Sequence, residues 1–159
     1  MAVERQEAVV PPELTFRSAN ESDVPDILRI ERQSYTFPWT EGIFRDCLRV
    51  NYTCRVAEIG MSIAGYGIMS IAAGEAHLLN LCVGEDYRCR GIGRRLLGHL
   101  LQVASSLGAR ESFLEARPSN TTAIRLYQSL GYVQIGIRRG YYQAIDGRED
   151  AIVLKRRLD

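Results

Sequence analysis

Several patterns of well-known meaning are missing from this sequence of 159 residues. No apolar run approaches the roughly 20 residues that cross a membrane, and the opening stretch MAVERQEAVVPPE carries acidic residues and no signal-peptide core. The cysteines show neither C-x-x-C nor C-x-x-C-H spacing and have only two histidines to assist them, which argues against a zinc site. They are Cys47, Cys54, Cys82 and Cys89. The sequence therefore predicts a cytoplasmic protein with reduced thiols, no metal and no membrane partner.

An excess of charge of one sign is also missing. The formal net charge is +1, so there is no general positive field for nucleic acid, and any anion site must be local. Lysine is nearly absent, because Lys155 is the only one, and arginine supplies the rest of the positive charge. Arginine suits bidentate binding of phosphate, but a codon bias of the genome explains the same excess. Nucleic acid is therefore not an expected partner.

The remaining composition is that of one globular domain. Hydrophobic residues make up 46% of the chain and charged residues 25%, which are ordinary values, and this length suffices for one core. No internal repeat or low-complexity linker interrupts the chain. We therefore predict a flexible N-terminal arm at residues 1–13 and a single domain at residues 14–159.

Hydrophobic periodicity and turn residues predict an α/β fold of the α+β kind. Predicted strands cover residues 14–19, 52–59, 62–72, 75–83, 111–117, 132–142 and 149–157. Predicted helices cover residues 20–35, 40–50, 92–107 and 118–132, and a glycine ends each of the last two. The order β-α-α-β-β-β-α-β-α-β-β contains a βαβ crossover, so the sheet is mixed rather than wholly antiparallel.

The stretch DYRCRGIGRRLLGHLL places Gly91 and Gly93 among arginines directly before an amphipathic helix. Free backbone N–H groups and the helix dipole favour an anion there, and glycine lets it approach the main chain closely. A Walker loop requires a lysine that is missing, and a dinucleotide fingerprint requires glycine where Leu96 stands. What remains, R-x-x-G-x-G, is either a nest of pyrophosphate size or a plain loop that starts a helix.

In this context R-x-x-G-x-G resembles the acetyl-coenzyme A site of the GNAT acetyltransferase superfamily. Local strings narrow the resemblance to its RimI type; they are FPWT at 37–40, LEARPSN at 114–120, AIRLY at 123–127, IRRGYY at 137–142 and DGREDAIVL at 146–154. Enzymes of this type are bacterial and acetylate the N-terminal alanine of a small-subunit ribosomal protein. The resemblance covers about residues 14–158 and departs at Pro118. It implies the GNAT fold, a mixed, mostly antiparallel central sheet with helices on both faces.

The resemblance implies acetyl-coenzyme A as co-substrate and assigns residues to it. The backbones of Leu81, Cys82 and Val83 would hold the pantetheine and acetyl end in a gap where two strands splay apart, and a backbone N–H near Cys82 would polarise the thioester. The pyrophosphate nest would comprise Arg88, Cys89, Arg90, Gly91, Ile92, Gly93 and Arg94. Asn120 would reach the cofactor from the following helix. Without the resemblance, Cys82 is typical of a core residue and Asn120 of an N-cap.

The resemblance also makes Glu115 the general base and Tyr127 the general acid. A protein α-amine has a pKa of about 7.7–8.0 against about 10.4 for lysine, so a modest base suffices. Glu115 lies in a strand of core residues, where burial should raise its pKa toward a useful value. A carboxylate paired with Arg117 or Arg125 is the alternative. Tyr127, in the next helix, can face the same cleft and hydrogen-bond the departing thiolate.

Aromatic residues are expected around the N-terminal tail of the acceptor, although each is also typical of core packing. They are Phe37, Trp39, Tyr141 and Tyr142, of which we predict Trp39 and Tyr141 to bind substrate. The implied partner is the N-terminal segment of a small-subunit ribosomal protein, whose α-amine attacks directly in a ternary complex. Two alternatives remain, namely the same fold acting on lysine or small-molecule amines, and a non-catalytic acyl-coenzyme A-binding module.

Overall fold

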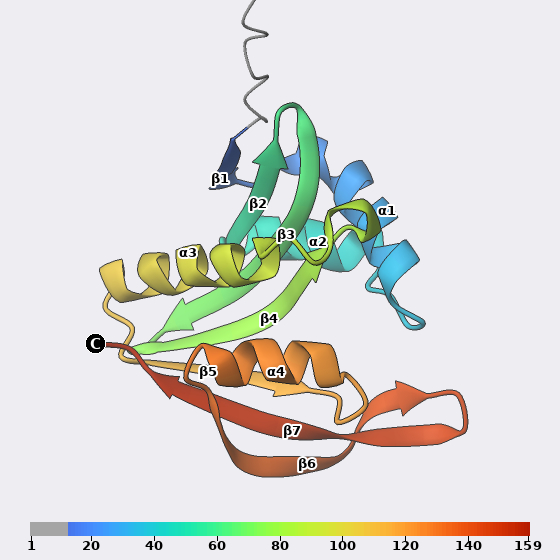
Figure 1. Cartoon of the computed structure of the whole chain (residues 1–159), viewed down its shortest axis with the longest axis vertical. Helices are drawn as coiled ribbons and strands as arrows, with labels where there is room; N and C mark the ends of the chain where they lie inside the picture. Colours follow the sequence, from blue (N-terminus) through green and yellow to red (C-terminus); the bar gives the residue numbers. More distant parts are fainter. Residues whose placement is uncertain (1–12) are drawn as a thin grey trace, which may run out of the picture.

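The computed structural model describes residues 13–159. These residues form one seven-stranded sheet with four α-helices and two short 3-10 helices (Figure 1). The predicted N-terminal arm, residues 1–13, lies outside the described residues except for Glu13. Among residues 13–159, no helix is both long and apolar enough to span a membrane.

The predicted order of elements is confirmed, with small changes at their ends. The strands are β1 (Leu14–Ser18), β2 (Thr53–Ile59), β3 (Ser62–Ala72), β4 (Glu75–Val83), β5 (Glu111–Ala116), β6 (Val133–Ala144) and β7 (Gly147–Arg157). The helices are η1 (Glu21–Asp23), α1 (Val24–Ser34), α2 (Glu41–Arg49), η2 (Glu85–Tyr87), α3 (Ile92–Ser106) and α4 (Thr121–Ser129). Helix α4 is shorter than predicted because it begins only after Asn120, whose side chain accepts a hydrogen bond from the Ala123 N–H.

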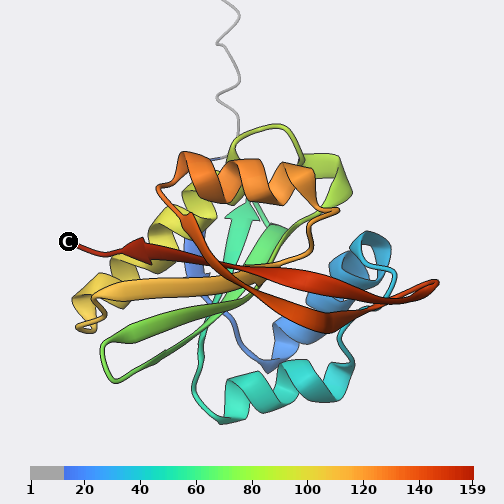
Figure 2. The ribbon, with the colours of Figure 1, turned by 90° about the horizontal axis from the view of Figure 1, so that it is seen from below.

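Helices cover both faces of the sheet (Figures 1 and 2). On one face, α3 and α4 pack through a core that includes Leu100 and Tyr127. On the other face, α1 and α2 pack through a second core that includes Ile27 and Phe44. The buried residues of α3 are those that recur every three or four positions, so the apolar pattern that predicts this helix is also its packing face.

The sheet opens between two neighbouring strands. The strand order is β1-β2-β3-β4-β5-β7-β6, and β4 and β5 form its parallel pair, with α3 as the crossover. These two strands pair only as far as Leu78 and Leu114, although β4 continues to Val83. At the same point the register between β3 and β4 shifts and leaves Leu79 without a partner, which is a β-bulge that bends the strand. Beyond Leu78, β4 and β5 therefore part.

Candidate active site

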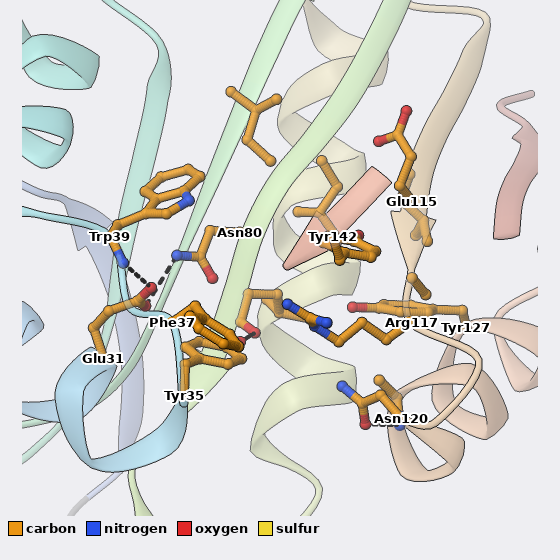
Figure 3. A pocket seen from close by; sticks show the side chains of 16 residues that line it. Glu31, Tyr35, Phe37, Trp39, Asn80, Glu115, Arg117, Asn120, Tyr127 and Tyr142 are labelled. Carbon is orange, nitrogen blue, oxygen red and sulfur yellow. Dashed lines mark hydrogen bonds between the residues drawn. The ribbon is translucent and has the colours of Figure 1, made fainter. Parts of the chain in front are cut away.

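A cavity of about 200 Å³ lies where β4 and β5 part. Its walls come from these two strands, α1, the α1–α2 connection, the start of α4 and β6, and the side chains converge from both sides (Figure 3). The charged and amide residues that line it are Glu31, Asn80, Glu115, Arg117 and Asn120. The aromatic residues that line it are Tyr35, Phe37, Trp39, Tyr127 and Tyr142. The opening thus collects side chains from distant parts of the sequence in one concave space.

Glu115 lies on β5 with its side chain only 7% exposed. Its Oε2 lies 2.5 Å from His77 Nε2 on the neighbouring β4, and its Oε1 lies 3.8 Å from the Arg138 Nε on β6. The predicted position, a carboxylate that faces a cleft from a strand of core residues, agrees with the structure. Its partners are His77 and Arg138, in place of Arg117 or Arg125.

The expected rise of the Glu115 pKa is wrong in direction. The hydrogen bond with His77 lowers the pKa of Glu115 below its ordinary value, and this effect exceeds that of burial, which acts in the opposite sense. The charges of His77 and Arg138 contribute to the same lowering. Glu115 is therefore an anion at neutral pH, able to accept a proton or a hydrogen bond.

Tyr127 lines the same cavity from α4 and is largely buried. Its ring packs edge-on against Tyr132, with centroids 6.0 Å apart. Burial raises the pKa of Tyr127 well above its ordinary value, so the hydroxyl keeps its proton and remains a hydrogen-bond donor. The structure thus brings Glu115 and Tyr127, predicted to act together, to the walls of one space (Figure 3).

The backbone ahead of α3 is left-handed at two residues, Cys89 with φ 63° and Gly91 with φ 75°. Gly91 is the N-cap of the helix and adopts this conformation without a steric penalty. For Cys89 the same conformation is strained, by roughly 1–3 kcal/mol. Left-handed residues ahead of a helix arrange successive N–H groups into an anion-binding concavity, so the loop geometry fits a pyrophosphate at the N-terminus of α3.

The arginines of this loop divide into two groups. Arg88 folds back onto the protein and donates to the Val83 carbonyl at 3.1 Å and to Ser34 Oγ at 2.9 Å. Arg94 donates to the Ser129 hydroxyl from the exposed surface, and Arg90 lies over the Tyr87 ring. Arg88 therefore connects the loop to α1 and β4, whereas Arg90 and Arg94 stay at the surface.

Of the remaining residues predicted for the cofactor, Leu81 and Asn120 line the cavity, whereas Cys82, Val83, Ile92 and Gly93 do not. Leu81 lines it, and its carbonyl accepts a hydrogen bond from the Tyr35 hydroxyl at 3.1 Å. The Cys82 side chain is buried in the core under α1 and α2 and does not line the cavity. Asn120 both caps α4 and lines the cavity, so the two readings of this residue are compatible. Ile92 is buried, and a Cβ on Gly93 would lie 3.6 Å from Val83 Cγ2.

Of the two predicted substrate residues, Trp39 lines the cavity, whereas Tyr141 does not. Tyr141 is 43% exposed, and its neighbour Tyr142 takes the place in the wall. The register between β6 and β7 shifts between Arg138 and Tyr142, so simple alternation of faces fails there. Arg117 lies 4.4 Å from the Tyr142 ring centre and holds this part of the wall.

Two polar residues of the wall, Glu31 and Asn80, were missed from the sequence. Glu31 lies at helical spacing after Val24, Ile27 and Leu28, on the apolar face of α1. An acidic residue on the apolar face of a helix indicates a buried polar contact, because a buried charge requires partners, and this pattern could have identified Glu31. Asn80 carried no comparable signal in its apolar strand.

The cavity at the sheet opening and the loop before α3 define a class of protein. Residues 24–132 match the family described as the acetyltransferase (GNAT) family, and the chain belongs to it. Acetyl-coenzyme A is the acetyl donor of this family, which fits the anion-binding loop geometry at α3. Among residues 13–159, no three His, Cys, Asp or Glu side chains are grouped to hold a metal ion.

Within that family, the chain is similar to enzymes named for a ribosomal substrate. It is 38% identical over 140 residues to the ribosomal protein bS18-alanine N-acetyltransferase of Escherichia coli K12, covering 88% of this chain and 95% of that enzyme. The crystal structure of the ribosomal-protein-S18-alanine N-acetyltransferase from Escherichia coli matches with a TM-score of 0.87 and 36% identity, over 92% of this chain and 95% of that one. Ard1 from Thermoplasma volcanium matches with a TM-score of 0.84 and 26% identity, over 92% and 98%. The predicted RimI-type resemblance and GNAT fold are confirmed.

Proposed function

We propose that this acetyltransferase moves the acetyl group of acetyl-coenzyme A to the α-amine of an N-terminal alanine, with ribosomal protein bS18 as the protein substrate. The observation that carries the proposal is the pair of Glu115 and Tyr127 on one cavity at the sheet opening. The names of the relatives that are similar over most of the chain support the choice of acceptor. The cytoplasm, where acetyl-coenzyme A and ribosomal proteins are found, is the proposed location, without nucleic acid or membrane as a partner.

The cofactor is proposed to lie between the start of α3 and the sheet opening. Backbone N–H groups from Cys89 to Gly93 bind the pyrophosphate at the positive end of the α3 dipole, and Arg90 and Arg94 add charge from the surface. Arg88 acts by holding the loop on Val83. The backbone from Leu81 to Val83 faces the pantetheine and acetyl end, and Asn120 approaches from α4.

The reaction is proposed to be a direct attack. The α-amine nitrogen attacks the thioester carbonyl carbon, so that a C–N bond forms and the C–S bond breaks. Glu115 takes the proton that leaves the nitrogen, directly or through one water, and His77 and Arg138 hold its carboxylate in place. Because burial raises the pKa of Tyr127, its hydroxyl stabilises the departing thiolate as a hydrogen-bond donor more readily than it surrenders its proton.

The acceptor is proposed to enter between the α1–α2 connection and β6. Phe37 and Trp39 supply one wall and Tyr142 the other, so Tyr142 replaces Tyr141 as the substrate-facing tyrosine. An N-terminal amine suits a base of lowered pKa, because the α-amine loses its proton about 2.5 pKa units more easily than a lysine side chain does.

The test is a panel of acceptors assayed by thiol release from acetyl-coenzyme A, with mass spectrometry to locate the acetyl group. A peptide that begins with free alanine should be acetylated, whereas the same peptide with a blocked N-terminus and an internal lysine should not. Faster labelling of the lysine peptide or of a polyamine would mean that the acceptor is another amine and not an N-terminal α-amine. Cofactor binding without turnover on any amine would indicate a non-catalytic binding module.

A further inference from the structure

Glu31 is an unusual member of the cavity wall, because it is an acidic residue and only 2% exposed. It lies on the face of α1 that packs on the sheet, among Val24, Ile27 and Leu28. A carboxylate removed from water costs several kcal/mol unless hydrogen-bond donors replace the water. The groups that donate hydrogen bonds to Glu31 therefore indicate its role.

Three donors reach the Glu31 carboxylate from three different elements. The Trp39 backbone N–H, in the α1–α2 connection, donates to Oε1 at 3.0 Å, and the Asn80 amide on β4 donates to Oε2 at 3.0 Å (Figure 3). The Tyr66 hydroxyl on β3 donates to the same Oε2. Glu31 thus connects the segment that carries Trp39 to the stretch of β4 that has left β5.

We propose that Glu31 is a positioning residue that fixes the width of the cavity at the end where the acceptor peptide enters. Glu31 thereby selects acceptors whose N-terminal residue has a small side chain. This inference rests on the proposed function. Trp39 and Asn80 both line the cavity, and Glu31 holds their two segments together. With the link intact, the segments cannot separate to admit a bulky N-terminal residue. Glu31 acts through these neighbours and takes no part in proton transfer.

The chemistry of the link requires a carboxylate. An ionised carboxylate only accepts, so its two oxygens can take all three donors at once. A glutamine keeps one accepting oxygen and preserves part of the link. An alanine leaves the Trp39 N–H and the Asn80 amide without an acceptor in a buried place, so these groups must move to find water.

The experiment compares Glu31→Ala, Glu31→Gln and Asn80→Ala, using peptides that begin with alanine or leucine. Glu31→Ala should raise the KM for the alanine peptide by about tenfold and reduce the preference for alanine over leucine, with kcat little changed. Asn80→Ala should act in the same direction, and Glu31→Gln should restore most of the preference. Acetyl-coenzyme A affinity, measured by calorimetry, should stay within about twofold of wild type, because the three donors to Glu31 belong to Trp39, Tyr66 and Asn80 and lie outside the loop before α3.

Tyr66→Phe is the matched control, because it removes one donor from the same carboxylate but leaves the link between Trp39 and Asn80. Tyr66 lies in the core under α1 and α2 and is outside the lining residues. Its variant should lose stability and keep the KM and the preference for alanine.

The inference is overturned if the Glu31 and Asn80 variants lose stability while peptide KM and preference stay as in wild type. It is also overturned if cofactor affinity and peptide KM weaken together, because that result indicates general distortion. If Glu31→Ala does not fold, Glu31→Gln and Asn80→Ala carry the same comparison. A wild-type enzyme that does not acetylate the alanine peptide contradicts the proposed function instead, whatever the Glu31 variants do.

Discussion

At the scale of single residues, Glu115 is governed by its neighbours on other strands. His77 Nε2 lies 2.5 Å from the Glu115 carboxylate and lowers the pKa of Glu115, despite burial. A lowered pKa makes a weaker base but a dependable anion, and the acceptor amine requires only modest help. The contact with His77 therefore makes the Glu115 carboxylate a weaker base, but it fixes the position of the carboxylate and keeps it ionised.

The lowered pKa of Glu115 predicts the pH dependence of the wild-type enzyme. Because the pKa of Glu115 is lowered, its carboxylate is already ionised across the neutral range and contributes no separate step there. The rise of kcat/KM with pH should follow the α-amine, with a midpoint of about 7.7–8.0. Peptide acetylation rates measured from about pH 5.5 to 9 test this range. A midpoint below this range that moves on replacing His77 would assign the step to the His77–Glu115 pair instead.

Variants of the two catalytic candidates should differ in their response to pH. Glu115→Gln removes the proton acceptor, so kcat/KM should fall by about 10²- to 10⁴-fold near neutral pH and recover partly as the amine deprotonates unaided. Tyr127→Phe removes a hydrogen bond that strengthens on the departing thiolate, so its loss should appear in kcat and persist in alkali. Equal losses that do not depend on pH would mean that both residues only shape the cleft.

At the scale of elements, the start of α3 depends on one backbone conformation. Gly91 has φ 75°, and no neighbouring atom lies within 4 Å of a Cβ built on it, so strain and not crowding opposes a side chain there. The N–H groups that follow Gly91 are those proposed to bind the pyrophosphate. The helix itself has a strong apolar face, so its existence does not depend on the cap.

Replacing Gly91 with alanine should therefore weaken acetyl-coenzyme A binding more than it weakens the fold. The left-handed conformation costs a non-glycine residue about 1–2 kcal/mol, and because the free loop relaxes to relieve this strain while cofactor binding restores it, a loss of roughly tenfold in affinity is expected by calorimetry. Gly98→Ala is the matched control, because Gly98 lies inside α3 with open space at its Cβ. It should stabilise the helix and leave the affinity unchanged. If a folded Gly91→Ala protein bound acetyl-coenzyme A with unchanged affinity, the pyrophosphate would have to bind at another place.

At the scale of the whole molecule, a partly buried ion pair connects the first strand to the first helices. The Arg17 guanidinium donates to both oxygens of Asp23 at 2.8 Å, and the Asn20 N–H donates to the same carboxylate. These bonds, Arg17 foremost, hold the pKa of Asp23 below its ordinary value. The stabilisation is present above the unfolded-state pKa of about 3.9 and is lost as the pH falls through the lower folded-state pKa.

Asp23→Asn should therefore destabilise the protein by about 1–3 kcal/mol at neutral pH, with a smaller difference from wild type in acid. Urea unfolding at about pH 7 and pH 3 measures both values. We propose that residues 14–159 unfold as one unit, in a single transition. Asp26→Asn is the control, because the Asp26–Arg29 pair is exposed and should contribute little. An equal loss for Asp23→Asn at both pH values would exclude the charge of Asp23 as the source.

Local patterns in the sequence predict the elements and part of the site. The apolar spacing in α3, the Asn120 cap and the glycine before the helix act within a few residues of chain, so they can be read without the fold. The strings that resemble the RimI type place Glu115 and Tyr127, and both side chains do line the cavity.

The tertiary structure alone decided the surroundings of those residues. Glu115 meets His77 across 38 positions of sequence, and only strand pairing brings the two together, which is why burial by itself predicts the wrong direction for its pKa. An irregularity in β6 turns Tyr142 into the cavity in place of Tyr141. Glu31 reaches the wall because α1 packs beside the opening. Electrostatics and cavity shape depend on distances between strands and helices, and no short stretch of sequence contains those distances.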